Sequence, residues 1–91
     1  MNVTMLCSHC YVMKDAGLLY LQSYDSTVAI YDYNQDKLIL GRHWDYSVTT
    51  LRHLYKFFEQ YLPQFELGKY KKQRIEQMIE QGLIEYADML V

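Results

Sequence analysis

The sequence predicts a small α+β domain, in which an antiparallel β-sheet of about three strands, including a β-hairpin, packs against two amphipathic α-helices. Two runs rich in β-branched and aromatic residues, 18–24 and 27–33, stand close together in the first half of the chain. Apolar residues then recur at helical spacing between 47 and 62 and, more weakly, between 69 and 81. Strands followed by helices are typical of the α+β class.

The chain has 91 residues, which leaves room for one core, so we expect a single domain over 1–91. Apolar residues make up 51% and charged residues 22%, the balance of a folded domain. The net charge is -2, so the chain as a whole lacks the basic excess that drives binding to phosphate backbones. The sequence shows neither a signal peptide nor a membrane span, so we expect a cytoplasmic protein.

The expected sheet lies in the first half of the chain, with strands at 18–24, 27–33 and 37–40. The residues between these runs favour turns, namely Asp25 and Ser26 in the first gap and Asn34, Gln35 and Asp36 in the second.

The first helix is expected to begin after Ser47, a good N-cap residue, and to end near Pro63, which disfavours helical geometry in the residue before it. Its core-facing stripe consists of Leu51, Leu54, Tyr55, Phe58, Tyr61 and Leu62. Phe57 lies off this stripe, and the face expected to meet solvent includes Arg52, His53 and Lys56.

The second helix is expected from about Lys69 to Gln81, with Gly82 in the left-handed conformation that ends many helices. Its apolar residues are fewer, so its packing is weaker. Residues 83–91 fit a strand by propensity and a short helix by spacing, and of the two we expect the strand.

Cys7 and Cys10 are the two cysteines of the chain. Two thiolates at this spacing can share one zinc ion, and His43 and His53 would complete a tetrahedral set. We nevertheless expect no metal and no cofactor, because structural zinc sites usually show a second closely spaced pair of ligands. Here the histidines are ten residues apart, and His53 lies within a predicted helix.

The loop 42–46 carries Arg, Trp and Tyr, the residue types that dominate binding hot spots. Together with the solvent face of the first helix, it predicts a partner-binding patch of Arg42, Trp44, Tyr46, Arg52 and Lys56. For Trp44 the alternative is a place in the core between the sheet and this helix, since aromatic residues dominate the burial of small cores.

A basic cluster at the start of the second helix is the expected place for any contact with nucleic acid, and it consists of Lys69, Tyr70, Lys71, Lys72 and Arg74. Nearby glutamates balance its charge and favour a solvated helix face. No catalytic residue is expected. His43, Asp45, Ser47 and His53 have suitable chemistry, but no local spacing places them within reach of one another.

From Ser23 to about Phe58 the sequence resembles small, largely uncharacterised proteins of phages and mobile elements of Gram-positive bacteria. The resemblance depends on the run Ser-Tyr-Asp-Ser-Thr-Val-Ala at 23–29, on Gly41, and on the run Tyr-Ser-Val-Thr-Thr-Leu-Arg-His at 46–53, with Phe57 or Phe58 following. This chain departs from the pattern at 43–45, where His-Trp-Asp stands in place of a shorter aromatic pair.

The resemblance implies an origin in a phage or mobile element. Phage accessory proteins of this size often inhibit host machinery stoichiometrically, and anti-CRISPR proteins are a prominent class among them. We therefore expect a non-enzymatic binding protein, namely an anti-CRISPR inhibitor that docks on a host CRISPR effector and blocks nucleic-acid binding or activation. The alternative is a small nucleic-acid-binding regulatory protein, in which Arg52, His53, Lys56 and the basic cluster contact phosphates.

Overall fold

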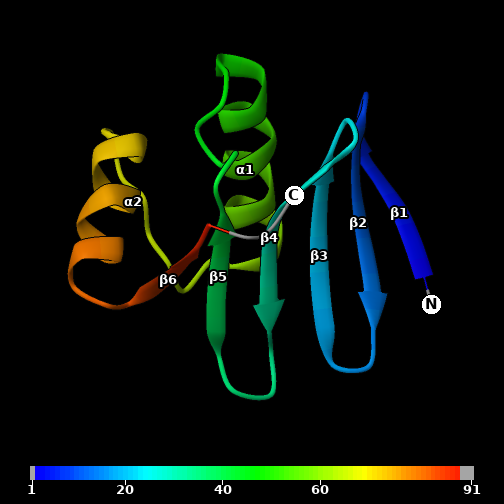
Figure 1. Ribbon diagram of the computed structural model, residues 1–91, viewed down its shortest axis with the longest axis horizontal. Helices are drawn as coiled ribbons and strands as arrows, with labels where there is room; N and C mark the ends of the chain where they lie inside the picture. Colours follow the sequence, from blue (N-terminus) through cyan, green and yellow to red (C-terminus); the bar gives the residue numbers. More distant parts are fainter. Residues whose placement is uncertain (1, 89–91) are drawn as a thin grey trace.

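The computed structural model describes residues 2–88, which form a six-stranded β-sheet and two α-helices (Figure 1). The strands are β1 (Asn2–Cys7), β2 (Cys10–Asp15), β3 (Leu18–Ser23), β4 (Ser26–Asp32), β5 (Lys37–Gly41) and β6 (Ile84–Ala87). The helices are α1 (Val48–Tyr61) and α2 (Lys71–Glu80), and both stand between β5 and β6 in the sequence.

The sheet is mixed, and its strands lie in the order of the sequence. The strands from β1 to β5 form an antiparallel meander, after which the chain crosses over through both helices and β6 pairs parallel to β5. The α+β character and the two helices agree with the sequence prediction. The predicted small sheet of about three antiparallel strands is wrong, because it omits the N-terminal hairpin of β1 and β2 and because the last strand, β6, pairs parallel to β5.

The N-terminal hairpin of β1 and β2 has weak sequence signals. Its turn consists of Ser8 and His9, without the glycine that marks most tight hairpins, and His9 takes the left-handed conformation at φ 60°. On the edge strand β1, Val3 and Met5 are both exposed. Their exposure means that no core pattern marks this strand, so propensity alone did not reveal the hairpin.

The turn between β3 and β4 consists of Tyr24 and Asp25, one residue earlier than predicted. Tyr24 takes a left-handed conformation at φ 54°. Its backbone N–H donates to the carbonyl of His9 at 2.8 Å, so this turn is joined to the turn of the N-terminal hairpin.

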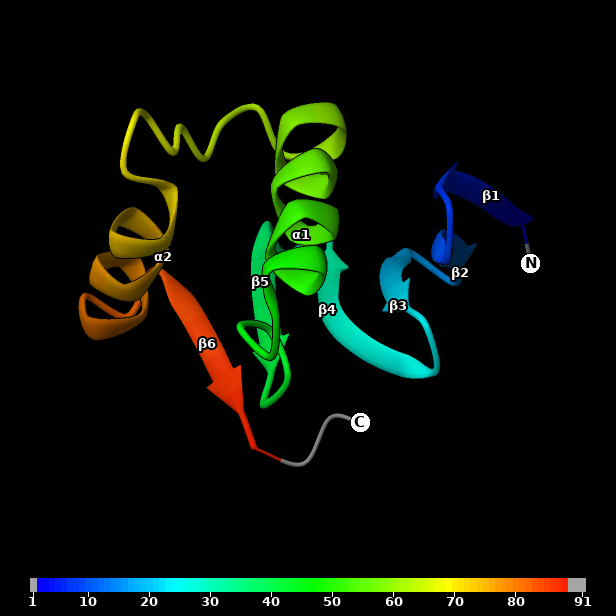
Figure 2. The same ribbon diagram turned by 90° about the horizontal axis from the view of Figure 1, so that it is seen from above.

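Both helices lie on one face of the sheet, and the sheet curves around α1 (Figure 2). Helix α1 contacts both β1 and β3, whereas α2 contacts β6. The core fills the space between the two layers, with buried side chains from β2 to β6 and from both helices, among them Leu21, Leu38, Leu54, Phe58 and Ile75.

Helix α1 begins and ends where the sequence predicts. Ser47 is its N-cap, and the Ser47 hydroxyl accepts a hydrogen bond from the N–H of Thr50 at 3.1 Å, while Leu62 is its C-cap. The buried face is broader than the predicted stripe, because Phe57 and His53 are only 0% and 5% exposed. Placing these two outside the core was wrong, since a curved sheet covers more of a helix than a flat one.

Helix α2 ends in a Schellman motif at the predicted glycine. The N–H of Leu83 donates to the carbonyl of Met78 at 2.9 Å, and the N–H of Gly82, at φ 77°, donates to that of Ile79 at 3.1 Å. The chain then enters β6, so the strand predicted for 83–91 is confirmed over 84–87. Residues 89–91 lie outside the described part of the chain.

The face of the sheet opposite the helices carries an apolar row. Val3, Met13, Tyr20, Ile30 and Ile39 are register partners on successive strands from β1 to β5. Directly paired residues point to the same face, so these side chains lie next to one another across five strands. Neither helix that the structure describes has the length and apolar content needed to cross a membrane.

Candidate functional site

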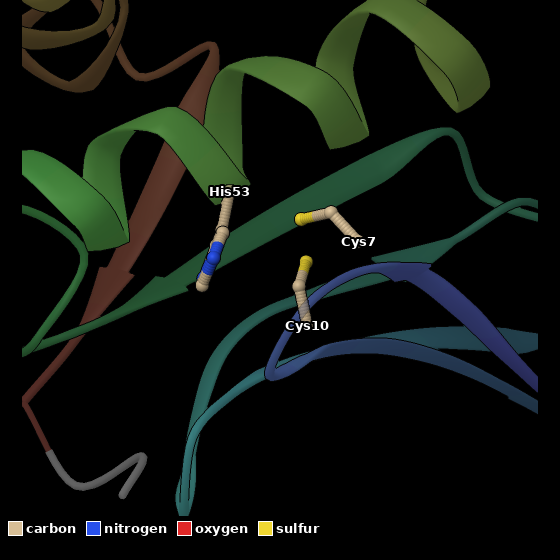
Figure 3. A group of neighbouring side chains, drawn as sticks. All are labelled: Cys7, Cys10 and His53. Atoms are coloured by element: carbon tan, nitrogen blue, oxygen red, sulfur yellow. The ribbon is translucent and has the colours of Figure 1, made fainter.

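Three side chains from distant parts of the sequence, Cys7, Cys10 and His53, meet between the N-terminal hairpin and α1 (Figure 3). The two Sγ atoms and a ring nitrogen of the histidine all lie within 4.8 Å of one another. Cys7 is half-buried, and the other two are buried. Within residues 2–88, this is the one group of three or more His, Cys, Asp or Glu side chains with metal-binding geometry.

A β-bulge brings the two thiols to the same face of the hairpin. Met5 pairs with Tyr11 and Cys7 pairs with Cys10, so Leu6 is an extra residue on β1. Without the bulge, strand alternation would place Cys7 on the face of the exposed Met5. With it, the two cysteines are directly opposite each other, and their side chains point towards α1 (Figure 3).

Helix α1 supplies the histidine from its buried face. Nδ1 of His53 lies 2.7 Å from Oγ of Ser23, at the end of β3. The ring of Tyr24 packs beside the imidazole at a tilt of 36°, with 5.9 Å between the ring centroids. These two contacts fix the orientation of the His53 ring beside the thiols.

The second histidine that the sequence offered as a ligand is not part of this cluster. Nδ1 of His43 lies 3.5 Å from Oγ of Ser26, and its ring packs beside Tyr46 with 5.5 Å between centroids. Of the four residues weighed as a zinc set, the structure therefore brings three together and separates one.

Burial makes charge unfavourable on two members of the cluster. It lowers the pKa of His53, the neighbouring His9 and Lys56 lower it further, and a hydrogen bond with the backbone of Ser8 opposes them. Burial also raises the pKa of the Cys10 thiol to about 12, with a hydrogen bond to Cys7 and the charge of Cys7 as smaller causes. A nucleophilic cysteine needs the opposite shift, so the Cys10 thiol lacks the properties of a reactive thiolate.

Two hollows flank Tyr24 on the surface above the cluster. The first, of about 310 Å³, is lined by Cys7 and His53 and, around them, by His9, Tyr24, Arg52 and Lys56 among others. The second, of about 300 Å³, is lined by Tyr24, His43 and Tyr46 among others. Because Tyr24 lines both hollows, it stands at the centre of a continuous surface.

We call His9, Tyr24, Tyr46, Arg52 and Lys56 the Tyr24 surface. Tyr24 is 50% exposed, and its ring stacks on that of His9, with 4.9 Å between centroids and 12° between planes. Few aromatic residues adopt its left-handed backbone conformation, and residues held in such conformations cluster at functional sites. Tyr24 and His9 were missed as site residues, since their positions depend on how two turns meet.

The predicted partner-binding patch is only partly assembled. Arg52, Lys56 and Tyr46 belong to the Tyr24 surface. Arg42 is exposed, and its Nε donates to Nε2 of His43 at 3.3 Å. Trp44 is only 6% exposed and packs in the core, so the alternative of a core role for this residue is confirmed and its role as an exposed hot spot was wrong.

With this geometry described, the chain can be compared with known proteins. Residues 1–79 match a protein family described as a family of unknown function (DUF8033). The chain belongs to the DUF8033 family. The matched range includes β1 to β5, α1 and nearly all of α2, and therefore every residue of the cluster and of the Tyr24 surface. No curated protein and no solved structure matches the chain.

In this DUF8033 domain the predicted nucleic-acid cluster of Lys69, Tyr70, Lys71, Lys72 and Arg74 lies at the start of α2 and just before it. Nζ of Lys71 lies 5.3 Å from the ring centroid of Tyr55 on α1, and Nε of Arg74 donates to the backbone carbonyl of Glu66 at 3.5 Å. The side chain of Glu59 lines one hollow with Lys71 and another with Lys56. A carboxylate thus stands between this cluster and the basic residues of the Tyr24 surface.

The residues considered for catalysis are also dispersed in this domain. Ser47 caps α1, His43 lies beside Tyr46, and His53 is buried against Ser23. The Ser23 and His53 pair resembles part of a nucleophilic site, but both side chains are at most 5% exposed. The cluster around His53 includes no carboxylate to orient it as a base.

Proposed function

We propose that this domain is a non-catalytic binding module that docks on another protein through the Tyr24 surface. The observation that carries the proposal is the exposed Tyr24 ring, held by a left-handed turn and stacked on His9 between two hollows. A rigid aromatic anchor flanked by concave surface is the usual form of a binding hot spot, because it loses little conformational entropy when a partner covers it.

The charges around Tyr24 favour an acidic partner surface. Arg52 and Lys56 are both exposed and line the hollow that reaches the cysteines, and the lining of that hollow includes no Asp or Glu. Basic groups at the rim of an aromatic contact increase the association rate with a negatively charged partner and help to fix its orientation.

A protein partner is favoured over nucleic acid by the distribution of charge. A phosphate backbone is best followed by a continuous basic track, whereas Glu59 lies between Lys56 and Lys71. The net charge of -2 also opposes nucleic-acid binding. A small nucleic-acid-binding regulator remains the second candidate, and the basic cluster at α2 is the feature that favours it.

The resemblance to phage and mobile-element proteins indicates which partner class to test first. On that basis, the partner is a nucleoprotein effector of bacterial defence in the host cytoplasm, and the domain acts as an anti-CRISPR inhibitor. The support for this narrower form is the resemblance between residues 23 and 58.

The test compares two charge reversals of equal size. The variant R52E/K56E changes the Tyr24 surface, and the matched control K69E/K72E makes the same change in net charge at α2. If the proposal is correct, R52E/K56E weakens binding to purified CRISPR effectors by at least about tenfold, and the control binds like the parent protein. The nucleic-acid alternative predicts that both variants, the control K69E/K72E included, bind DNA or RNA more weakly than the parent protein in a gel shift, with the parent's affinity falling steeply as salt is added.

Tyr24→Asn provides a second test with little change to the fold. Asparagine tolerates the left-handed conformation better than other non-glycine residues, so the turn should form without the aromatic ring. We expect the thermal unfolding midpoint to change little and partner binding to fall by at least about tenfold. If both Tyr24→Asn and R52E/K56E bind the partner with parental affinity, the Tyr24 surface is not the interface. The apolar row on the opposite face of the sheet then becomes the candidate.

A further inference from the structure

We infer that Cys7, Cys10 and His53 form a Zn²⁺ site that joins the N-terminal hairpin to α1. The sequence argued against a metal because it showed only one closely spaced pair of ligands. The fold supplies the third ligand from more than forty residues further along the chain. This inference is independent of the proposed binding function, which concerns the surface above the cluster.

The spacing of the three ligand atoms fits a small cation. Because these atoms are at most 4.8 Å apart, some point lies within about 2.8 Å of all three. Zinc is bound by sulfur at about 2.3 Å and by imidazole nitrogen at about 2.0–2.1 Å. Each ligand therefore needs to move by less than about 1 Å, which small rotations of the side chains supply.

The donor set selects the class of metal. Thiolate sulfur and imidazole nitrogen favour Zn²⁺, while Mg²⁺ and Ca²⁺ need oxygen ligands, and the cluster includes no carboxylate. A Cys₂His set is also known among zinc sites that have three protein ligands and an open fourth position.

His53 has the kind of hydrogen-bond partner that orients a metal-binding histidine. Ligating histidines almost always donate the N–H of their other ring nitrogen to an oxygen, which fixes the tautomer and the ring orientation. Here Oγ of Ser23 lies 2.7 Å from Nδ1, in a buried position. In the tautomer whose Nδ1 donates to this hydroxyl, Nε2 is the ring nitrogen left with a lone pair for a cation.

The fourth coordination position faces the solvent side of the cluster. Cys7 and His53 line the hollow of about 310 Å³ below the Tyr24 surface, whereas Cys10 is fully buried. A water molecule that enters through this hollow can complete a tetrahedral set. Binding of the cation would then fix the tip of the hairpin against the helix, a long-range connection of the kind that stabilises small domains.

The experiment uses the untagged protein, kept reduced and first treated with a chelator. Cobalt is the probe, because Co²⁺ in a tetrahedral thiolate site shows absorption bands in the red and a thiolate-to-metal charge-transfer band in the near ultraviolet. We expect these bands to saturate at one equivalent of Co²⁺ and to disappear when Zn²⁺ is added. At a hundredfold excess over Kd, Zn²⁺ should raise the thermal unfolding midpoint by about 10 °C or more.

Matched substitutions distinguish this site from metal bound elsewhere on the protein. His53→Gln and Cys7→Ser should each weaken Co²⁺ binding by at least about 100-fold. His43→Gln makes the same chemical change in the histidine outside the cluster and should bind Co²⁺ like the parent protein. Cys7 is only half-buried, so Cys7→Ser is the variant expected to keep its fold, and circular dichroism of the metal-free protein checks this.

Three results would overturn the inference. The first is a reduced parent protein that takes up Co²⁺ without thiolate bands, or takes up none. The second is parental Co²⁺ affinity in a folded Cys7→Ser variant. The third is a protein that binds no metal when reduced but forms a Cys7–Cys10 disulfide completely in air, because the pair would then be a redox site.

Discussion

Nδ1 of His53 lies 2.7 Å from Oγ of Ser23, thirty residues earlier in the chain, and this contact joins α1 to the end of β3. Both side chains are buried, at 5% and 3% exposure. Every buried side-chain nitrogen and oxygen atom in the described residues has a hydrogen-bond partner. The pair therefore holds a polar ring in an otherwise apolar core without leaving an unsatisfied group.

Replacing Ser23 with alanine tests this relationship. The change removes the partner of a buried imidazole nitrogen, and an unsatisfied buried polar group costs about 1–3 kcal/mol. We expect urea unfolding to show that loss for Ser23→Ala. The control Ser8→Ala, in an exposed turn, should stay within about 0.5 kcal/mol of the parent protein. Equal stabilities of the two variants would mean that the hydrogen bond contributes nothing.

Phe57 distinguishes the observed core from the stripe expected from sequence. It is fully buried, whereas Leu51, which belongs to the expected stripe, is only half-buried. We expect Phe57→Ala to lower the free energy of unfolding by about 3–5 kcal/mol, and Leu51→Ala to lower it by less. Denaturant unfolding with both variants checks the order, and a larger loss for Leu51→Ala would show that the curved sheet does not cover α1 as described.

A side chain at Gly17 is expected to strain the backbone and to displace the end of the Asn34 side chain. Gly17 has φ +82°, and a Cβ atom there would clash with Nδ2 of Asn34. Gly68, at φ +69°, has nothing within 4 Å of the same position. Gly68→Ala should therefore show only the cost of the left-handed conformation, about 1–2 kcal/mol, and Gly17→Ala should cost more.

A double variant separates the clash at Gly17 from the backbone strain. In the Gly17→Ala background, Asn34→Ala removes the atoms that the new methyl group meets. We expect G17A/N34A to be more stable than additive single effects predict, by thermal or urea unfolding, because the two sites are in contact. If the two single effects on the free energy of unfolding add up to that of the double variant, backbone strain alone accounts for the destabilisation by Gly17→Ala.

Tyr31 should make stability depend on pH in the alkaline range. Burial raises the pKa of Tyr31 to about 12, helped by the hydrogen bond from its hydroxyl to Asp36. The unfolded chain loses this proton near pH 10, so the folded state binds more protons between about pH 10 and 12. The stabilising effect is complete below pH 10 and is lost as the pH rises towards 12.

The comparison of parent protein and Tyr31→Phe isolates this effect from the titration of lysines and other tyrosines. At pH 8 the parent protein should be more stable, because its hydroxyl donates to Asp36 and accepts from Nε2 of Gln64 at 3.0 Å. The difference should shrink as the pH rises above 10. Melting curves whose separation stays constant up to pH 11.5 would contradict the shift.

Several boundaries were predictable because they depend on neighbouring residues. The hydroxyl of Ser47 reaches an N–H three residues away, and Gly82 ends α2 within a motif of six residues. The strands β3, β4 and β5 were predicted because their apolar runs are separated by short segments of turn-forming residues. The turn at Tyr24 was misplaced by one residue, since no local signal favours an aromatic residue in the left-handed conformation.

The candidate site was predictable only in its composition. The sequence identifies the spacing of Cys7 and Cys10 and offers two histidines, but local periodicity places His53 on the solvent face of its helix. The cluster forms because Leu6 bulges, which turns Cys7 inward, and because the sheet curves until its N-terminal hairpin reaches α1. Both effects come from pairing between strands, which the spacing of residues within one strand does not show.

By itself, then, the sequence determined the α+β class, the two helices with their caps, the central hairpin, and the chemical types present at the site. Only the tertiary structure decided the number of strands, the parallel pairing of β6, the burial of Phe57 and Trp44, and the choice of His53 over His43 beside the thiols. The physical reason is the distance along the chain between the residues that interact. Caps, turns and periodicity arise from contacts within a few residues. Sheet curvature arises from pairing across successive strands, and the meeting of Cys7 with His53 joins residues more than forty positions apart.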